Sequence, residues 1–305
     1  MPLLKQLFKP TNRDLLKRIG FTLVALAIFI IGTTIQVPGT DSITSNLGFL
    51  ELVNTMGGGA LQNFSIFALG VMPYITATIV MQLLGELIPY FQELNKQGHV
   101  GRQKINTYSR YMGILFAFIQ GYAFSFMFLG RTASATEYIY ISVVLTAGTA
   151  FLLWLGDQIT RKGIGNGLSL IIMAGIIATL PQMFIDAFQG LVVFDGTTQE
   201  ITLGIVKFIL FAIIYFAIIV GVIFVQMAER KVPIQYANKS TAYGGNSSYV
   251  PIKVNTAGVV PVIFASSLMA IPGIIAGLIN NESFSLFVSN YLTSVSYTHL
   301  TLPTI

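Results

Sequence analysis

The sequence predicts an all-α membrane protein with several transmembrane helices. Of its 305 residues, 54% are hydrophobic and only 10% are charged, and the mean hydropathy is +0.74. A soluble domain usually carries about 25% charged residues, so this chain has too few charges to cover a surface that faces water. Apolar runs of about 20 residues, the length that crosses the hydrocarbon core of a bilayer, recur along the chain. These observations predict a polytopic helical protein.

Seven candidate spans follow a basic segment at residues 1–18. The second is interrupted, and its first half is too short to cross a bilayer alone. The polar stretches 91–109 and 228–254 are expected to be loops, and 280–305 a polar tail. The spans are expected at about 19–37, 60–69 with 72–90, 110–130, 138–156, 168–188, 203–227 and 255–279.

The interrupted span carries the clearest functional signal. It opens with the triplet Gly57-Gly58-Gly59, and Gly70 and Pro73 stand in the middle of its apolar run. Proline lacks a backbone donor and clashes with the preceding helical turn, so we expect the helix to break there. Inside a bilayer, broken helices are tolerated only where the freed backbone faces protein or a water-filled cavity. This span is therefore a candidate for the lining of a path through the membrane.

The distribution of charge predicts the orientation of the chain. If the N-terminus is cytoplasmic and the spans alternate, all of the 17 basic residues except Arg131 and Lys207 fall at the cytoplasmic side. Basic loops favour that side, so we expect a cytoplasmic N-terminus. The opposite side collects acidic residues, namely Asp41, Glu51, Glu137, Asp186, Asp195, Glu200 and Glu282.

Motifs for enzymatic chemistry are missing from the sequence. It has no cysteine, only two histidines, and no phosphate-binding, zinc-protease or nucleophile-elbow motif. We therefore expect no enzyme activity, no cofactor and no metal site. Ionisable pairs are also lacking in the spans, which disfavours a small-solute transporter, although broken helices also occur in that class. A path lined by aliphatic side chains favours a hydrophobic constriction.

Four stretches resemble the SecY family, the main subunits of the bacterial protein-conducting channel. They are residues 57–84, 101–111, 148–176 and 251–268, in the order found in the family. The resemblance implies ten spans in two pseudo-symmetric halves related as an inverted repeat. Residues 19–189 would be the first half and 190–279 the start of the second. Spans eight to ten are absent, and the tail from about residue 294 looks foreign, so a truncated, non-functional fragment is the alternative.

The resemblance also implies roles for particular residues. The segment at about 47–65 would be the plug that blocks the closed pore, and Gly70 and Pro73 would begin a helix of the lateral gate. Ordinary helix packing is the alternative for the pore-ring residues, and simple cytoplasmic charge is the alternative for the docking residues. The plug would include Gly57, Gly58, Gly59, Ala60 and Leu61; the pore ring Val71, Ile75, Ile172 and Ile263; and the docking surface Arg102, Lys104, Arg230 and Lys231.

The expected function is Sec-dependent protein export across, and insertion into, the bacterial cytoplasmic membrane. The resemblance implies that signal peptides enter through the lateral gate while the plug and the hydrophobic ring seal the pore. It implies these partners: the SecE and SecG subunits, the SecA motor, the ribosome, signal peptides, unfolded secretory chains and membrane lipids.

Overall fold

We describe the protein from a computed structural model. It describes residues 13–40, 51–129, 134–192, 198–234, 248–255 and 282–288, together with the single residues 258, 265, 272 and 275. The chain divides into two compact units, Met1–Pro181 with Ile263–Ile305, and Gln182–Val262. Each unit is considered by itself below.

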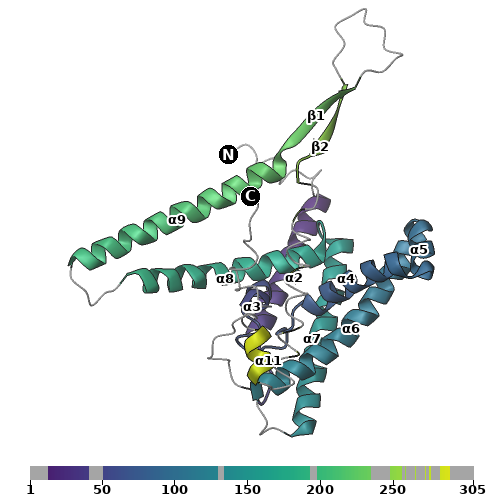
Figure 1. Cartoon of the computed structure of the whole chain (residues 1–305), viewed down its shortest axis with the longest axis horizontal. Coiled ribbons are helices and arrows are strands. Elements are labelled where there is room, and N and C mark those ends of the chain that lie inside the picture. Colours follow the sequence, from purple (N-terminus) through teal and green to yellow (C-terminus); the bar gives the residue numbers. More distant parts are fainter. Residues whose placement is uncertain are drawn as a thin grey trace, which may run out of the picture. The chain divides into compact units, whose positions relative to one another are not determined.

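Five helices of the described part are long and apolar enough to cross a membrane. A sixth candidate is the pair α4 (Met72–Leu87) and α5 (Pro89–Lys96), which is bent by 98° at the break. These elements confirm the predicted multi-span helical fold (Figure 1). The predicted seventh span, 255–279, lies almost entirely outside the described residues. The five long helices are α2 (Arg13–Thr34), α6 (His99–Leu129), α7 (Ala135–Lys162), α8 (Gly167–Leu191) and α9 (Thr198–Met227).

The predicted loop at 91–109 is wrong, because this stretch is almost entirely helical. Ile88, which precedes Pro89, is extended (φ −102°, ψ 122°), as residues before proline usually are, and α4 ends there. After α5, Gly98 takes a left-handed conformation (φ +70°) that glycine adopts without strain, and α6 starts at His99. Polar residues can form a helix outside a bilayer. The length of the apolar run alone therefore predicts a start of α6 that lies further along the chain than the observed one.

A short turn joins α7 to α8. Lys162 ends α7, and the side chain of Asn166 accepts hydrogen bonds from the backbone nitrogens of Leu168 (3.1 Å) and Ser169 (3.4 Å). Asparagine at this position caps the free amides of a helix start. The Gly-rich stretch of residues 163–167 is therefore a helix–helix connection.

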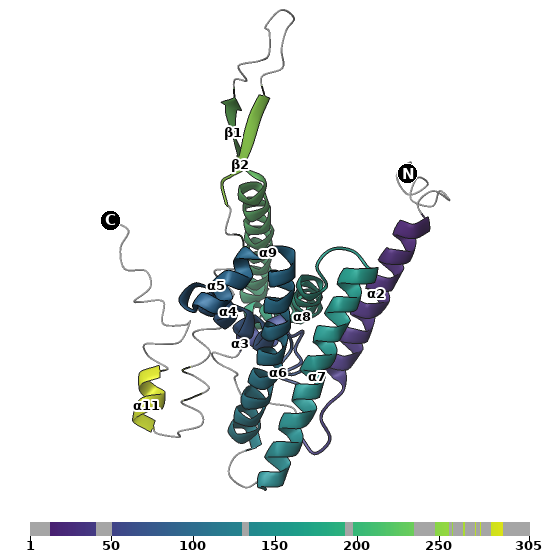
Figure 2. The same cartoon turned by 90° about the vertical axis from the view of Figure 1, so that its right-hand side faces the viewer.

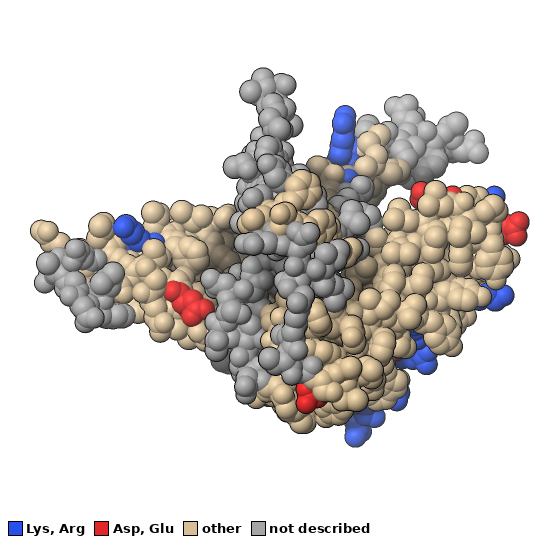
Figure 3. All heavy atoms as spheres, turned by 60° about the horizontal axis from the view of Figure 1, so that its bottom comes forward, with Lys and Arg blue, Asp and Glu red and all other residues tan. Residues whose placement is uncertain are grey.

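The first unit is a helical bundle in which α6 contacts both α4 and α7, and α2 contacts α7 (Figure 2). One ion pair joins the polar ends of α6 and α7, from Arg110 to Asp157 at 2.6 Å. Two short helices, α3 (Glu51–Met56) and α11 (Glu282–Phe287), belong to the same unit. No charged side chain is buried among the residues whose side-chain exposure the structure describes, and much of the surface in Figure 3 is uncharged.

The second unit combines the end of α8, helix α9 and a β-hairpin. Phe184 of α8 packs against Phe211, Tyr215 and Phe216 of α9, which holds the two helices together. Beyond these aromatic contacts α9 is almost wholly exposed, as expected for a helix that faces lipid. The strands β1 (Glu229–Ile234) and β2 (Ser248–Lys253) pair antiparallel and follow α9 directly (Figure 1).

Candidate functional site: a buried irregular segment

The core of the first unit is formed around residues 57–71, here called the buried segment. It lies between α3 and α4 and contains turns with no regular helix. Of its residues, only Gln62 is exposed. A segment of irregular backbone at the centre of a helical membrane protein is unusual, because every polar backbone group there must find a partner within the protein.

Hydrogen bonds within the segment and to its neighbours meet part of this demand. Ser65 N donates to Ala60 O (2.9 Å), and Gly70 N donates to Phe67 O (2.8 Å). A short antiparallel bridge then ties the segment to the chain that follows α2: Val37 N donates to Phe64 O and Ile66 N donates to Ile35 O, both at 3.0 Å. The Thr149 hydroxyl of α7 also donates to Gly70 O (3.3 Å). These bonds allow the segment to remain buried without helical structure.

Three helices make room for the segment, each at a glycine. A Cβ atom at Gly148 of α7 would overlap the carbonyl oxygen of Ile66. One at Gly175 of α8 would overlap the carbonyl oxygen of Met56, beside the segment, and lie 3.0 Å from Gly58 N. One at Gly32 of α2 would overlap the ring of Phe67. We call these three positions the glycine cradle.

Side chains of the buried segment supply both hydrophobic clusters of the unit. Phe64 and Leu69 are among those in the first cluster, while Phe67 and Val71 are among those in the second. Phe67 stacks between two aromatic rings, Phe29 of α2 at 6.2 Å and Phe151 of α7 at 5.8 Å between centroids. The segment is thus the element against which α2, α6 and α7 pack.

The structure brings together the three predicted pore-ring residues that it describes. Val71 is buried at the end of the segment, and Ile75 lies in the first turn of α4. Ile75 and Ile172 of α8 are partly buried and pack against both clusters, and Val71 belongs to the second. The fourth predicted member, Ile263, lies outside the described residues. The three described side chains thus gather around the second cluster, beside the buried segment.

The predicted break lies where the proline indicates. Gly70 has a left-handed backbone (φ +55°), and α4 begins at Met72 with Pro73 in its first turn, a position that tolerates the missing amide. The chain before this point is not helical, so the prediction of a broken span is confirmed. The second half is shorter than predicted, however, because Pro89 bends it.

The predicted plug glycines and their neighbours lie inside the bundle. Gly58 and Gly59 have left-handed φ values of +73° and +78°, which require glycine or impose strain on any other residue. Gly57, Ala60 and Leu61 are buried, the last two with no exposed surface. Of the segment predicted as a plug, residues 47–50 lie outside the described part.

The predicted docking residues are exposed, but their local structure differs from the expectation. Arg102 and Lys104 lie in the first two turns of α6, not in a loop. The predicted loop at 228–254 is wrong at both ends, which form β1 and β2: Arg230 and Lys231 of β1 pair with Ile252 and Pro251 at the base of the hairpin. The Lys231 ammonium lies 4.8 Å from the centroid of the Tyr249 ring.

The glycine cradle and the aromatic stack on Phe67 were not predicted from the sequence. A signal was present, since Gly32, Gly148 and Gly175 each interrupt an apolar helix, and small residues mark close helix contacts in membranes. What they contact was not visible from local sequence.

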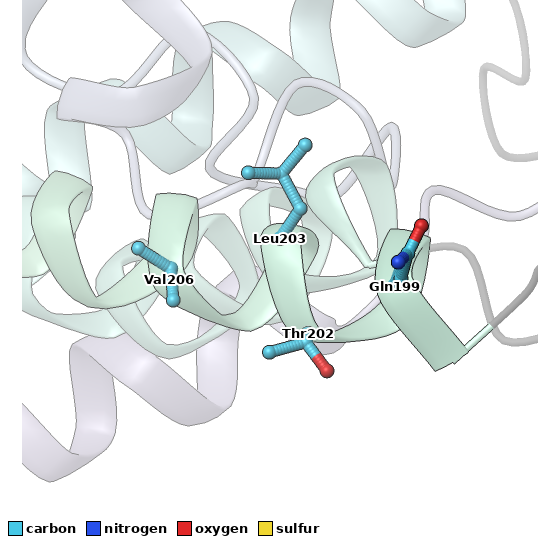
Figure 4. A pocket seen from close by; sticks show the side chains of 4 residues that line it. All are labelled: Gln199, Thr202, Leu203 and Val206. Carbon is cyan, nitrogen blue, oxygen red and sulfur yellow. The ribbon is translucent and has the colours of Figure 1, made fainter.

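A separate apolar hollow on α9, lined by Gln199, Thr202, Leu203 and Val206 (Figure 4), includes none of the predicted site residues.

Together, the spans, the irregular core and the aliphatic side chains around it define a multi-span membrane protein with a protein-conducting-channel fold. A superposition on a solved structure of a protein-conducting channel covers 90% of this chain and 59% of that channel's chain, with a TM-score of 0.64. A superposition on Sec61 from a canine ribosome–channel complex of the endoplasmic reticulum covers 90% of this chain and 60% of the Sec61 chain, with a TM-score of 0.63. Both are 18% identical to this chain, so this likeness establishes the fold alone.

The family follows from sequence. A model of the SecY family matches residues 65–303, and this chain belongs to the SecY family. Protein translocase subunit SecY of Staphylococcus epidermidis is 49% identical over 277 residues, covering 86% of this chain and 64% of the relative. The Bacillus subtilis subunit is 43% identical over 292 residues, covering 91% and 67%. The chain thus spans about two thirds of these relatives. The family match also includes most of the tail expected to be foreign.

Replacing Gly148 tests the glycine cradle. Gly148→Ala places a methyl group against the Ile66 carbonyl, so we expect a loss of about 1–3 kcal/mol in the free energy of unfolding, as for other overpacked sites. Gly20→Ala on α2 is the matched control, because nothing lies within 4 Å of its Cβ position. Thermal unfolding in detergent measures both variants. Equal midpoints for the two would refute the close packing at Gly148.

Proposed function

We propose that this chain forms the channel subunit of a bacterial translocase, which exports unfolded secretory chains and inserts membrane proteins. The observation that supports the proposal is the buried segment itself: in a member of the SecY family, an irregular segment lies where the aliphatic side chains of Val71, Ile75 and Ile172 converge. The relatives named protein translocase subunit SecY support the same activity. The subunit performs no chemistry, and the energy comes from a partner.

The pore ring is the seal in this proposal. Val71, Ile75, Ile172 and Ile263 are bulky, uncharged side chains, which can part around a passing polypeptide and close again afterwards. A narrow apolar constriction also excludes water, so ions cannot follow a continuous file of water through it. Residues 47–65 block the closed pore from the outer side and leave when a secretory chain enters.

The remaining roles follow the same proposal. Signal peptides enter the lipid through a lateral gate that includes α4, whose start is set by Gly70 and Pro73. The protein lies in the cytoplasmic membrane with its N-terminus inside, as the basic residues favour. SecE and SecG are its companion subunits. The SecA motor or the ribosome docks on the exposed basic side chains of Arg102, Lys104, Arg230 and Lys231.

Photocrosslinking tests the path. A crosslinking amino acid at Ile75 or Ile172 of the full-length protein should react with a secretory chain stalled during export, because both side chains would line the pore. Val220 on α9, which is 65% exposed, is the control for a lipid-facing position and should not react. Absence of crosslinks from both isoleucines to the stalled chain would contradict the proposed path.

Salt-dependent ribosome binding tests the docking surface. Replacing Arg230 and Lys231 together with alanine should weaken the binding of ribosomes to membrane vesicles, because ribosomal RNA is a polyanion. In a plot of the logarithm of the binding constant against the logarithm of the salt concentration, the slope should become less steep by about 0.7–0.9 for each removed cationic side chain that contacts a phosphate. Lys207→Ala, on the predicted outer side, is the matched control. An unchanged slope in the double variant would remove these two residues from the docking surface.

A further inference from the structure

Two adjacent residues in the buried segment are in unfavourable local states. The hydroxyl of Ser65 has no exposed surface and no hydrogen-bond partner among the residues that the structure describes. Its backbone, in contrast, is paired, since the amide donates to Ala60 O and the carbonyl accepts from Ala68 N, both at 2.9 Å. A buried hydroxyl that has lost its hydrogen bonds to water is destabilising unless the protein replaces them.

Phe64, the preceding residue, has a φ of +45°, and it is the one residue other than glycine with a positive φ in the described part of the chain. A side chain with a Cβ atom is strained in this left-handed region, and phenylalanine lacks the polar group that helps asparagine there. The surroundings hold it in place: its carbonyl accepts from Val37 N, and its ring packs edge-on against Phe128 at 6.0 Å. Strain of this kind persists only where surrounding contacts enforce it.

The rest of the segment is packed so well that release would be difficult. Leu61, Phe64 and Leu69 are at most 2% exposed, and Phe67 is sandwiched between two aromatic rings. Moving the segment out of the glycine cradle would remove these contacts. The two penalties oppose that packing, and both vanish on release, because the hydroxyl of Ser65 then reaches water and the backbone of Phe64 relaxes.

We propose that Ser65 and Phe64 form a release device, in which an unpaired buried hydroxyl and a strained backbone lower the barrier to displacing the buried segment. This inference rests on the proposed function insofar as displacement of residues 57–65, the part of the segment that overlaps the predicted plug, opens a pore, while Val71 stays at the start of α4. The device determines how often the segment leaves the glycine cradle, whereas other residues determine which chains pass through the pore. Ser65 therefore tunes the equilibrium between docked and released states without contacting the transported chain.

Ser65→Ala tests the device, because it removes the unpaired hydroxyl and keeps the backbone. Residues 1–305 contain no cysteine. Once any cysteine elsewhere in the full-length protein has been replaced, one cysteine introduced at Ala60, which has no exposed surface, reports release through its rate of reaction with a small maleimide. In the full-length protein in membrane vesicles, Ser65→Ala should slow this labelling about fivefold or more. It should also raise the midpoint of thermal unfolding in detergent.

Ser125→Ala is the matched control. Ser125 is equally buried, but its hydroxyl donates to Gly121 O at 2.7 Å within α6, outside the segment. Labelling at residue 60 should be unchanged in this variant. Labelling that is equally fast or faster with Ser65→Ala, or a lowered unfolding midpoint, would overturn the release device. If Ser65→Ala slows labelling while crosslinks to a secretory chain fail, the device stands and the channel function fails.

Discussion

The contact between the buried segment and the glycine cradle is the interaction on which the first unit depends. Ordinary helices would meet one another directly, but here Gly32, Gly148 and Gly175 leave space for a chain that is not helical. The segment fills that space with Phe64, Phe67 and other apolar side chains, and both hydrophobic clusters form around it. A side chain larger than hydrogen at a cradle position would push backbone or ring atoms apart, so the cradle and the segment specify each other.

The membrane explains why the irregular backbone of residues 57–71 lies in the core. Unpaired amides and carbonyls are costly in hydrocarbon, so only regular helices can face it. In the buried segment, turns, the bridge to residues 35–37 and the Thr149 hydroxyl supply the missing partners. A helix meets this demand within its own backbone, so α9 can be apolar and exposed along nearly its whole length. A non-helical element at the centre is well suited to move, because its departure breaks no helix.

Much of the fold could be predicted from the sequence, because hydrocarbon thickness imposes a length on apolar runs and proline imposes a break. Run lengths located α2, α6, α7, α8 and α9, and Pro73 located the start of α4. The helical course of residues 99–109 was missed, since polar residues form helix and loop alike. The position of Arg230 and Lys231 at the base of the hairpin depends on strand register, which a single sequence did not reveal.

The site was predictable in part. The family resemblance named Val71, Ile75 and Ile172, and the structure places these three side chains around one cluster. Their role as a pore ring stays a prediction. The glycine cradle, the stack on Phe67 and the unpaired hydroxyl of Ser65 depend on contacts between residues far apart in the chain. For example, 82 positions separate Ile66 from Gly148 by their numbers, and no local pattern links them. Such pairs became visible only when the helices were placed side by side.

A reversible lock on the buried segment tests the central claim most directly. The Cβ position of Gly59 lies 3.9 Å from Thr179 Cγ2 of α8, so Gly59→Cys with Thr179→Cys can form a disulfide, and residues 1–305 supply no other cysteine. The left-handed backbone of residue 59 strains any side chain there, so the reduced double variant is the reference for the oxidised one. Export of a secretory precursor into vesicles that carry the full-length double variant is then measured before and after oxidation. We predict that oxidation stops export and that a reductant restores it. Undiminished export with the disulfide fully formed would contradict the account.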